Sequence, residues 1–174
     1  MHSATRMSDC AAVVMGVTSC GKTTVGEALA RALDLRFVEG DTLHPKANVA
    51  KMSAGIPLTD QDRWPWLARI GEAIGGNEGV IASCSALKRI YRDLIRETAG
   101  RPVSFIFLDG SRELLAARIA ARKGHFMSPS LLDSQLATLE PPGPDEKALR
   151  LDMARPLEEL VAEAKIFITR DKFR

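Results

Sequence analysis

The sequence predicts an α/β protein in which helices cover both faces of a parallel sheet. Strand-like and helix-like segments alternate along the 174 residues, and this alternation is typical of parallel sheets. The pattern Gly-x-x-x-x-Gly-Lys-Thr spans residues 16–23, between an apolar run at 11–15 and a helix-like run at 24–33. Strand, glycine loop and helix in this order form the context in which such a pattern binds phosphate. We therefore expect three layers, with a ligand cleft at the carboxyl ends of the strands.

Residue spacing justifies each element in turn. Residues 11–15 are all apolar, which suits a buried strand, and the apolar residues of 24–33 recur at helical spacing. Thr59 or Asp60 provides an N-cap for a helix that ends near Gly75. The other expected strands are 36–39, 79–83, 103–108 and 149–153, and the other expected helices are 46–54, 85–98, one that begins after Ser111, 129–139 and 156–165.

The composition is that of an ordinary globular protein. Hydrophobic residues make up 45% and charged residues 26%, and the net charge of +2 is too small to indicate a nucleic-acid or membrane partner. No apolar run reaches the length of a membrane span. Residues 1–9 are polar, unlike a signal peptide, and are interpreted as a flexible leader to a single domain at 10–174.

The three cysteines, Cys10, Cys20 and Cys84, lack the spacing of a metal site, and their odd number fits a reducing cytoplasm. Cys84 is interpreted as small apolar filler. For Cys20, which lies inside the glycine loop, we hypothesise a lowered thiol pKa, because a helix N-terminus stabilises a thiolate.

The glycine loop carries the chemistry of nucleotide binding. Gly16 and Gly21 let the backbone bend and approach an anion, and successive N–H groups at the start of the helix point at phosphates. Lys22 adds a positive charge on the β- and γ-phosphates of ATP, and Thr23 offers a hydroxyl to Mg²⁺. The predicted nucleotide-binding residues are Gly16, Val17, Thr18, Ser19, Cys20, Gly21, Lys22, Thr23 and Thr24.

Two acids, Glu39 and Asp41, stand two residues apart at the end of the second expected strand. Strand geometry points both side chains the same way, toward the cleft. One can hold Mg²⁺ through water while the other meets an acceptor hydroxyl, and His44 would share this cleft. The alternative is that both acids are merely exposed at a strand end.

Basic residues gather in two further places. Arg118 and Arg122 share a helix face and lead into the Lys123-Gly124-His125 loop, as a lid over ATP would. Lys88 and Arg92 follow the third strand one helical turn apart and could clamp an anionic substrate. A solvated cationic surface is the alternative in both places. These residues favour an ATP-dependent kinase for a small, anionic, hydroxylated acceptor, and a nucleotide-binding regulator without turnover is the alternative from another class.

Several longer motifs resemble the gluconate kinases (gluconokinases), a family of the shikimate-kinase-like and adenylate-kinase-like P-loop group. The resemblance covers about 11–168. Its most specific parts are the Cys-Ser-Ala-Leu-Lys stretch at 84–88 and the Lys-Gly-His-Phe stretch at 123–126. The chain departs from the family pattern at Ser19-Cys20, where Gly-Ser is usual, and at Glu39, where Asp is frequent.

The resemblance implies transfer of the ATP γ-phosphoryl group to the 6-hydroxyl of D-gluconate, and another small sugar acid is the alternative acceptor. It implies a P-loop NTPase fold with a five-stranded parallel sheet, a lid at about 120–135 and a homodimer. By position, Lys22, Asp41 and Arg122 are then catalytic, Thr23 and Glu39 hold the metal, and Arg118 lies near the adenine. The implied substrate-binding residues are Asp41, His44, Arg63, Lys88, Tyr91, Arg92 and His125.

Overall fold

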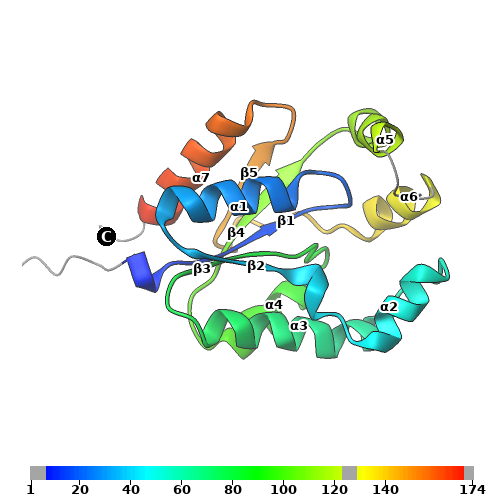
Figure 1. Cartoon of the computed structure of the whole chain (residues 1–174), viewed down its shortest axis with the longest axis horizontal. Coiled ribbons are helices and arrows are strands. Elements are labelled where there is room, and N and C mark those ends of the chain that lie inside the picture. Colours follow the sequence, from blue (N-terminus) through cyan, green and yellow to red (C-terminus); the bar gives the residue numbers. More distant parts are fainter. Residues whose placement is uncertain (1–6, 123–128, 171–174) are drawn as a thin grey trace, which may run out of the picture.

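The computed structural model describes residues 7–122 and 129–170, which contain one five-stranded parallel sheet (Figure 1). The strand order is β2-β3-β1-β4-β5, so the first strand along the chain lies in the middle of the sheet. The expected parallel sheet of five strands is confirmed. The strands are β1 (Ala11–Met15), β2 (Arg36–Glu39), β3 (Val80–Ser83), β4 (Ser104–Asp109) and β5 (Ala148–Asp152).

Helices cover both faces of the sheet, which confirms the three expected layers. On one face lie α1 (Lys22–Leu33) and α7 (Leu157–Arg170), which pack against each other. On the other face lie α3 (Asp60–Gly75) and α4 (Arg89–Ala99), as Figure 1 shows. Every residue of β1 and β3 is buried, because a parallel sheet covered on both faces has no solvent side.

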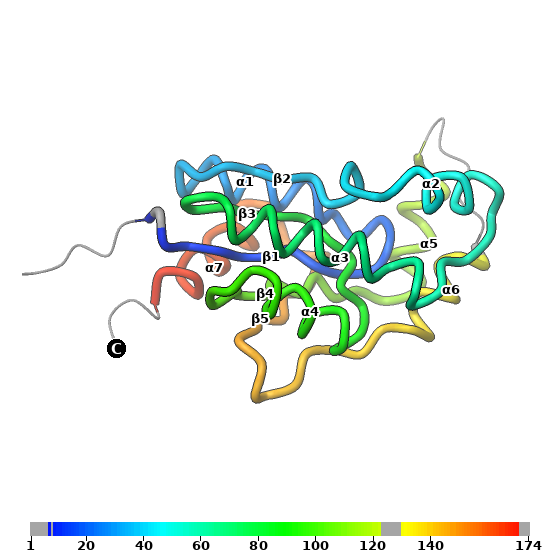
Figure 2. The backbone as a smooth tube through the Cα atoms, turned by 90° about the horizontal axis from the view of Figure 1, so that it is seen from below, coloured from blue at the N-terminus to red at the C-terminus, as the bar shows by residue number. Residues whose placement is uncertain are grey.

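The remaining helices lie beyond the carboxyl ends of the strands, where a ligand cleft is expected. They are α2 (Lys46–Ser53), α5 (Arg112–Ala121) and α6 (Pro129–Thr138), and Figures 1 and 2 both show them gathered at this end. The described residues also contain two short 3₁₀ helices, η1 (Met7–Asp9) and η2 (Gly40–Leu43). None of the helices in these ranges is long and apolar enough to cross a membrane.

Tertiary contacts shift some boundaries from the expected ones. The helix predicted at 85–98 begins only at Arg89, because residues 84–88 form a loop in which Ala86 has a φ of 44°. The backbone N–H of Arg89 then donates to the Glu140 side chain at 2.9 Å, which satisfies a helix-end donor from a distant segment. The closing helix, expected to end at 165, continues to Arg170.

The start of α3 is set by a capping box. Thr59 accepts a hydrogen bond from the Asp62 backbone, and the Asp62 side chain accepts one from the Thr59 backbone. Of the two N-cap candidates, Thr59 therefore holds the position, and the Asp60 side chain is available for other contacts.

The described residues include only the two flanks of the expected lid at about 120–135, which are the end of α5 and the start of α6. Residues 123–128, among them His125, lie outside the described part of the chain, as do residues 1–6 of the expected leader.

Candidate active site

The phosphate-loop residues 16–21 connect β1 to α1, as predicted. Gly16 and Gly21 have φ values of 147° and 97°, and a Cβ on Gly16 would lie 2.7 Å from the Cys20 sulfur. Ser19 also adopts a left-handed backbone, with φ 64°, although it is not glycine. Its Oγ is buried without a hydrogen-bond partner among the described residues. The loop therefore holds a strained residue with an unused hydroxyl beside the expected phosphates.

Lys22 and Cys20 belong to the first turn of α1 and to the phosphate loop, respectively. The Lys22 Nζ donates to the Val17 carbonyl of the phosphate loop at 2.9 Å, and its contact with the phosphates stays a prediction. Cys20 is buried, and burial raises the pKa of its thiol despite the lowering influence of Lys22. The hypothesis of a low-pKa Cys20 is wrong, because desolvation outweighs the helix terminus. Cys84 is buried with a pKa raised to about 12 by desolvation, in agreement with apolar filler.

The carboxylate of Glu39 bridges the phosphate loop and the end of β3. It accepts from the Thr23 hydroxyl at 2.5 Å and from the Ser83 hydroxyl at 2.6 Å, and Ser83 Oγ in turn accepts from the Gly40 N–H at 3.2 Å. Mg²⁺ prefers oxygen ligands and takes few of them from the protein. The hydroxyl of Thr23 and the carboxylate of Glu39 therefore suit this ion. The described residues hold no cluster of three or more His, Cys, Asp or Glu side chains that could bind a metal ion.

Asp41 lies beyond the carboxyl end of β2 in a different geometry from the one expected. The chain leaves the strand after Glu39 and enters η2, so strand alternation does not relate the two acids. Asp41 is exposed at the start of η2, and a buried hydrogen bond from Trp66 Nε1 to the Gly40 carbonyl, 2.9 Å long, anchors this helix.

The ring of His44 is fixed beside Asp41. It stacks on Trp66 with centroids 4.0 Å apart, and its Nδ1 lies 3.2 Å from Asn48 Nδ2. Burial lowers the pKa of His44, the Asp41 charge raises it, and the Arg63 charge lowers it, with a lowered pKa as the net result.

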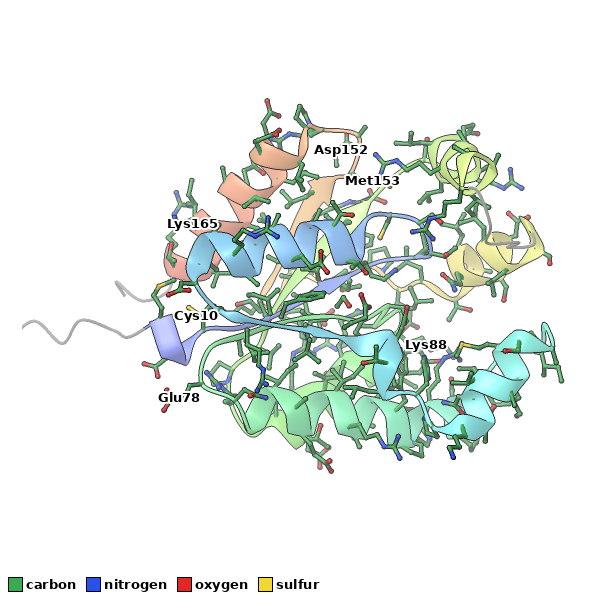
Figure 3. The ribbon with its side chains drawn as sticks, in the orientation of Figure 1. Cys10, Glu78, Lys88, Asp152, Met153 and Lys165 are labelled. Atoms are coloured by element: carbon green, nitrogen blue, oxygen red, sulfur yellow. The ribbon has the colours of Figure 1, made fainter. Side chains whose placement is uncertain are left out.

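Three of the predicted substrate residues, Arg63, Lys88 and Tyr91, gather around Asp60. The Tyr91 hydroxyl donates to Asp60 at 2.5 Å and accepts from Arg63 at 2.9 Å, and Lys88 Nζ lies 3.3 Å from the same carboxylate oxygen. The hydrogen bond from Tyr91, followed by that from Lys88, lowers the pKa of Asp60. Burial, with Asp60 as the second cause, raises the pKa of Tyr91 to about 12. Figure 3 shows Lys88 near the carboxyl end of the sheet, on the side of α2.

Arg92 does not join this cluster. Its guanidinium is fully buried and pairs with Glu146 at 2.7 Å and 3.0 Å. Its other N–H groups donate to the carbonyls of Ala86, Leu87 and Glu140. The prediction that Arg92 clamps a substrate is therefore corrected: its donors are occupied within the protein, and it holds two loops together.

The two helices that flank the expected lid, α5 and α6, contact the phosphate loop and the end of β5. Arg118 donates to the Met153 carbonyl at 3.1 Å, and a Cβ on Gly21 would lie 3.8 Å from the Arg118 guanidinium. Arg122 is exposed at the end of α5. From α6, the Gln135 side-chain oxygen accepts from the Thr18 backbone N–H at 2.7 Å.

Sequence reasoning missed several residues of this region, most of which contact partners far away along the chain. Asn48 is an exception, because it lies only four residues after His44. Asp60 stands in the Asp-x-Asp-Arg stretch at 60–63, where local pattern indicates a helix cap, but its partners Lys88 and Tyr91 follow 28 and 31 residues later. Gln135 carries no local signal. The missed residues that contact predicted site residues are Asn48, Asp60, Trp66, Ser83 and Gln135.

Known proteins resemble this chain both in sequence and in structure. A model of the AAA domain family matches residues 12–142. The chain is 50% identical over 157 residues to a gluconokinase of Gluconobacter oxydans (strain 621H), which covers 86% of this chain and 88% of the relative. A crystal structure of a gluconokinase from Sinorhizobium meliloti 1021 matches with a TM-score of 0.87 at 53% identity, covering 95% and 94% of the two chains.

A more distant likeness defines the fold. The crystal structure of a shikimate kinase from Bacteroides thetaiotaomicron matches with a TM-score of 0.64 over 90% of this chain and 96% of that one. At 16% identity this match shows the P-loop kinase fold alone. The two closer matches extend over most of both chains, and the chain belongs to the gluconokinase family.

Proposed function

We infer that the protein transfers the γ-phosphoryl group of ATP to the 6-hydroxyl of D-gluconate, giving 6-phosphogluconate and ADP. The observation that carries this inference is the meeting of two sites at one edge of the sheet. The phosphate loop follows β1, and the Arg63–Lys88–Tyr91 cluster lies beside the loop that follows β3. The Gly16 N–H donates to the Ser85 carbonyl at 3.3 Å and joins the two loops directly.

The nucleotide site uses the backbone amides of residues 16–23 and the charge of Lys22. Phosphoryl transfer depends on positioning and on neutralising the charge of the phosphates. Mg²⁺, when bound through Thr23 and Glu39, supplies part of that neutralisation. We assign Arg122 to the γ-phosphate and Arg118 to the adenine side, because the Arg118 guanidinium lies near Gly21 and donates to the Met153 carbonyl just after β5.

The acceptor site uses Asp41 to orient the 6-hydroxyl and to accept its proton. The cations of Arg63 and Lys88 face one carboxylate, that of Asp60, so the cluster keeps one net positive charge for the carboxylate of gluconate. His44 and His125 complete the proposed acceptor site, and Arg92 is left out of it.

Two further properties belong to this proposal. We expect a homodimer, which sedimentation velocity tests directly. We also expect a cytoplasmic protein, because its three cysteines are free and buried and need no oxidising compartment.

A coupled assay of ADP release tests the proposed function. D-gluconate is compared with shikimate and a panel of sugar acids, with and without Mg²⁺. We expect the highest kcat/KM with D-gluconate and loss of turnover when Mg²⁺ is removed with a chelator. A higher kcat/KM with another acid, or ADP release that does not depend on an acceptor, would overturn the assignment.

A further inference from the structure

The side chain of Asn48 is buried in α2 and makes two contacts through one nitrogen. Its Nδ2 donates to the Asp62 carbonyl at 2.9 Å and lies 3.2 Å from the Nδ1 of His44. Asn48 is only 3% exposed, so water does not compete for these contacts. A primary amide nitrogen carries two hydrogens and no accepting lone pair.

These two contacts determine where the proton of His44 lies. The Asp62 carbonyl can only accept, which identifies the contacting atom of Asn48 as its nitrogen. The second hydrogen of that nitrogen then points at Nδ1 of His44, and Nδ1 must act as the acceptor. A neutral imidazole has one N–H, so the proton of His44 is on Nε2. Among the residues that the structure describes, Nε2 has no hydrogen-bond partner.

The surroundings of His44 favour the neutral ring. Asp41 is the acid that faces it and favours the charged form, whereas burial and the Arg63 charge disfavour that form, and the pKa is lowered overall. A proton on Nδ1 would also meet the N–H of Asn48. Stacking on Trp66 fixes the plane of the ring, with an interplanar angle of 16°, and therefore the direction of Nε2–H.

We propose that Asn48 is a positioning residue that holds His44 as a neutral hydrogen-bond donor, whose Nε2–H binds a hydroxyl oxygen of the sugar-acid acceptor beside Asp41. The proposal rests on the proposed function and deepens it. His44 then serves neither as a general base nor as a cation for the carboxylate. The proton of the acceptor goes to Asp41, and the carboxylate goes to Arg63 and Lys88.

Long-range ¹H–¹⁵N NMR of the full chain tests the tautomer without any substrate. The sequence contains three histidines, and the His44→Gln variant identifies the signals of His44. We expect the Nε2–H pattern with a pKa below the ordinary 6.5. In Asn48→Ala we expect mixed tautomers and a higher pKa. An Nδ1–H pattern in the wild type, or an unchanged spectrum in Asn48→Ala, would overturn the proposal.

Kinetics of two His44 variants test the donor role. Glutamine offers an N–H near the position of Nε2, whereas leucine has a similar size and no donor. We expect His44→Leu to raise the KM for D-gluconate about tenfold, as loss of one hydrogen bond predicts, and His44→Gln to recover most of that loss. The KM for ATP should not change in either variant. If His44→Gln were as impaired as His44→Leu, His44 would be acting as a base or a cation instead.

Asn77→Ala is the matched control, because this asparagine also donates a side-chain hydrogen bond, to the Ala73 carbonyl, but lies at the other end of α3. It should leave both the His44 spectrum and the gluconate KM unchanged. Thermal melts show whether the Asn48→Ala variant is folded. If it is not, the kinetics of His44→Leu and His44→Gln still test the donor role of His44. A wild-type protein that does not phosphorylate D-gluconate would overturn the proposed function. If the wild type is active but His44→Leu leaves the KM for D-gluconate unchanged, only this inference is overturned.

Discussion

The guanidinium of Arg92 and the carboxylate of Glu146 form a buried two-point ion pair that ties α4 to the loop before β5. Nε and Nη2 of Arg92 lie 2.7 Å and 3.0 Å from the two oxygens of Glu146. Arg96 adds a second cation at 2.6 Å. Because Arg92 also binds the Ala86 and Leu87 carbonyls, this pair supports the loop that leads to Lys88.

Breaking this pair should destabilise the whole domain. Arg92→Ala leaves Glu146 buried with one cation fewer, and loss of one partner of a buried pair costs about 3–5 kcal/mol in the free energy of unfolding. Arg92→Lys should recover only part of the lost stability, because a lysine cannot donate to two loops and a carboxylate together. Urea denaturation measures both. The control is Arg112→Ala, which removes an exposed ion pair with Asp133 and should change the free energy of unfolding little. Equal losses of stability in the two alanine variants would contradict a stabilising role for the Arg92–Glu146 pair.

Acid should weaken the same pair in a defined pH window. Burial alone would raise the pKa of Glu146, but hydrogen bonds from Arg92, Arg96 and the Gly143 N–H outweigh it and lower the pKa from 4.5 to about 2. A depressed folded-state pKa means that the stabilisation is complete above the unfolded value and is lost as the pH falls from 4.5 toward 2. Urea denaturation at a series of pH values should therefore show a smaller acid-dependent loss in Glu146→Gln than in the wild type. Parallel curves for the two proteins would remove Glu146 from this role.

Removal of the phosphate-loop lysine should abolish turnover. In Lys22→Ala the β- and γ-phosphates lose the cation that neutralises them, and we expect kcat/KM to fall by about a thousandfold or more. The coupled assay measures this loss. Lys165→Ala, an exposed lysine on α7 (Figure 3), is the control and should retain full activity. Substantial turnover in Lys22→Ala would place the nucleotide elsewhere.

Asp41 should matter for turnover much more than for nucleotide affinity. Asp41→Asn keeps the shape but cannot accept a proton, and loss of a general base lowers kcat by about 10²–10⁴-fold. Calorimetry with an ATP analogue should give nearly the wild-type Kd, because the phosphate loop does not involve Asp41. Equal losses of kcat and of nucleotide affinity would remove Asp41 from the acceptor site.

Lys88 should determine acceptor affinity. Lys88→Ala removes one of the two cations that face Asp60, so we expect the KM for D-gluconate to rise about tenfold or more while the KM for ATP stays constant. Arg89→Ala is the neighbouring control, because Arg89 pairs with Asp145 outside the cluster. A rise in the ATP KM alone would exclude Lys88 from the acceptor site.

Local pattern was sufficient for the parts of this protein that depend on neighbouring residues. The glycine loop at 16–23 and the apolar strand 11–15 each follow from spacing over a few residues, and local pattern limits the N-cap of α3 to Thr59 or Asp60. Backbone bending and capping are short-range effects, and an unbroken apolar run marks a strand for burial between two layers of helices. The expected strand alternation of Glu39 and Asp41 is not among these, because the chain leaves the strand after Glu39 and enters η2.

The tertiary structure decided the partners of each charged side chain. Lys88 and Arg92 look equivalent in the sequence, yet Lys88 lies in the cluster around Asp60, whereas Arg92 is buried against Glu146, 54 residues away. The thiol of Cys20 has a raised rather than a lowered pKa because packing around it excludes water. Burial and long-range pairing arise only when distant segments meet, and these two effects decide which basic residues remain available to a ligand.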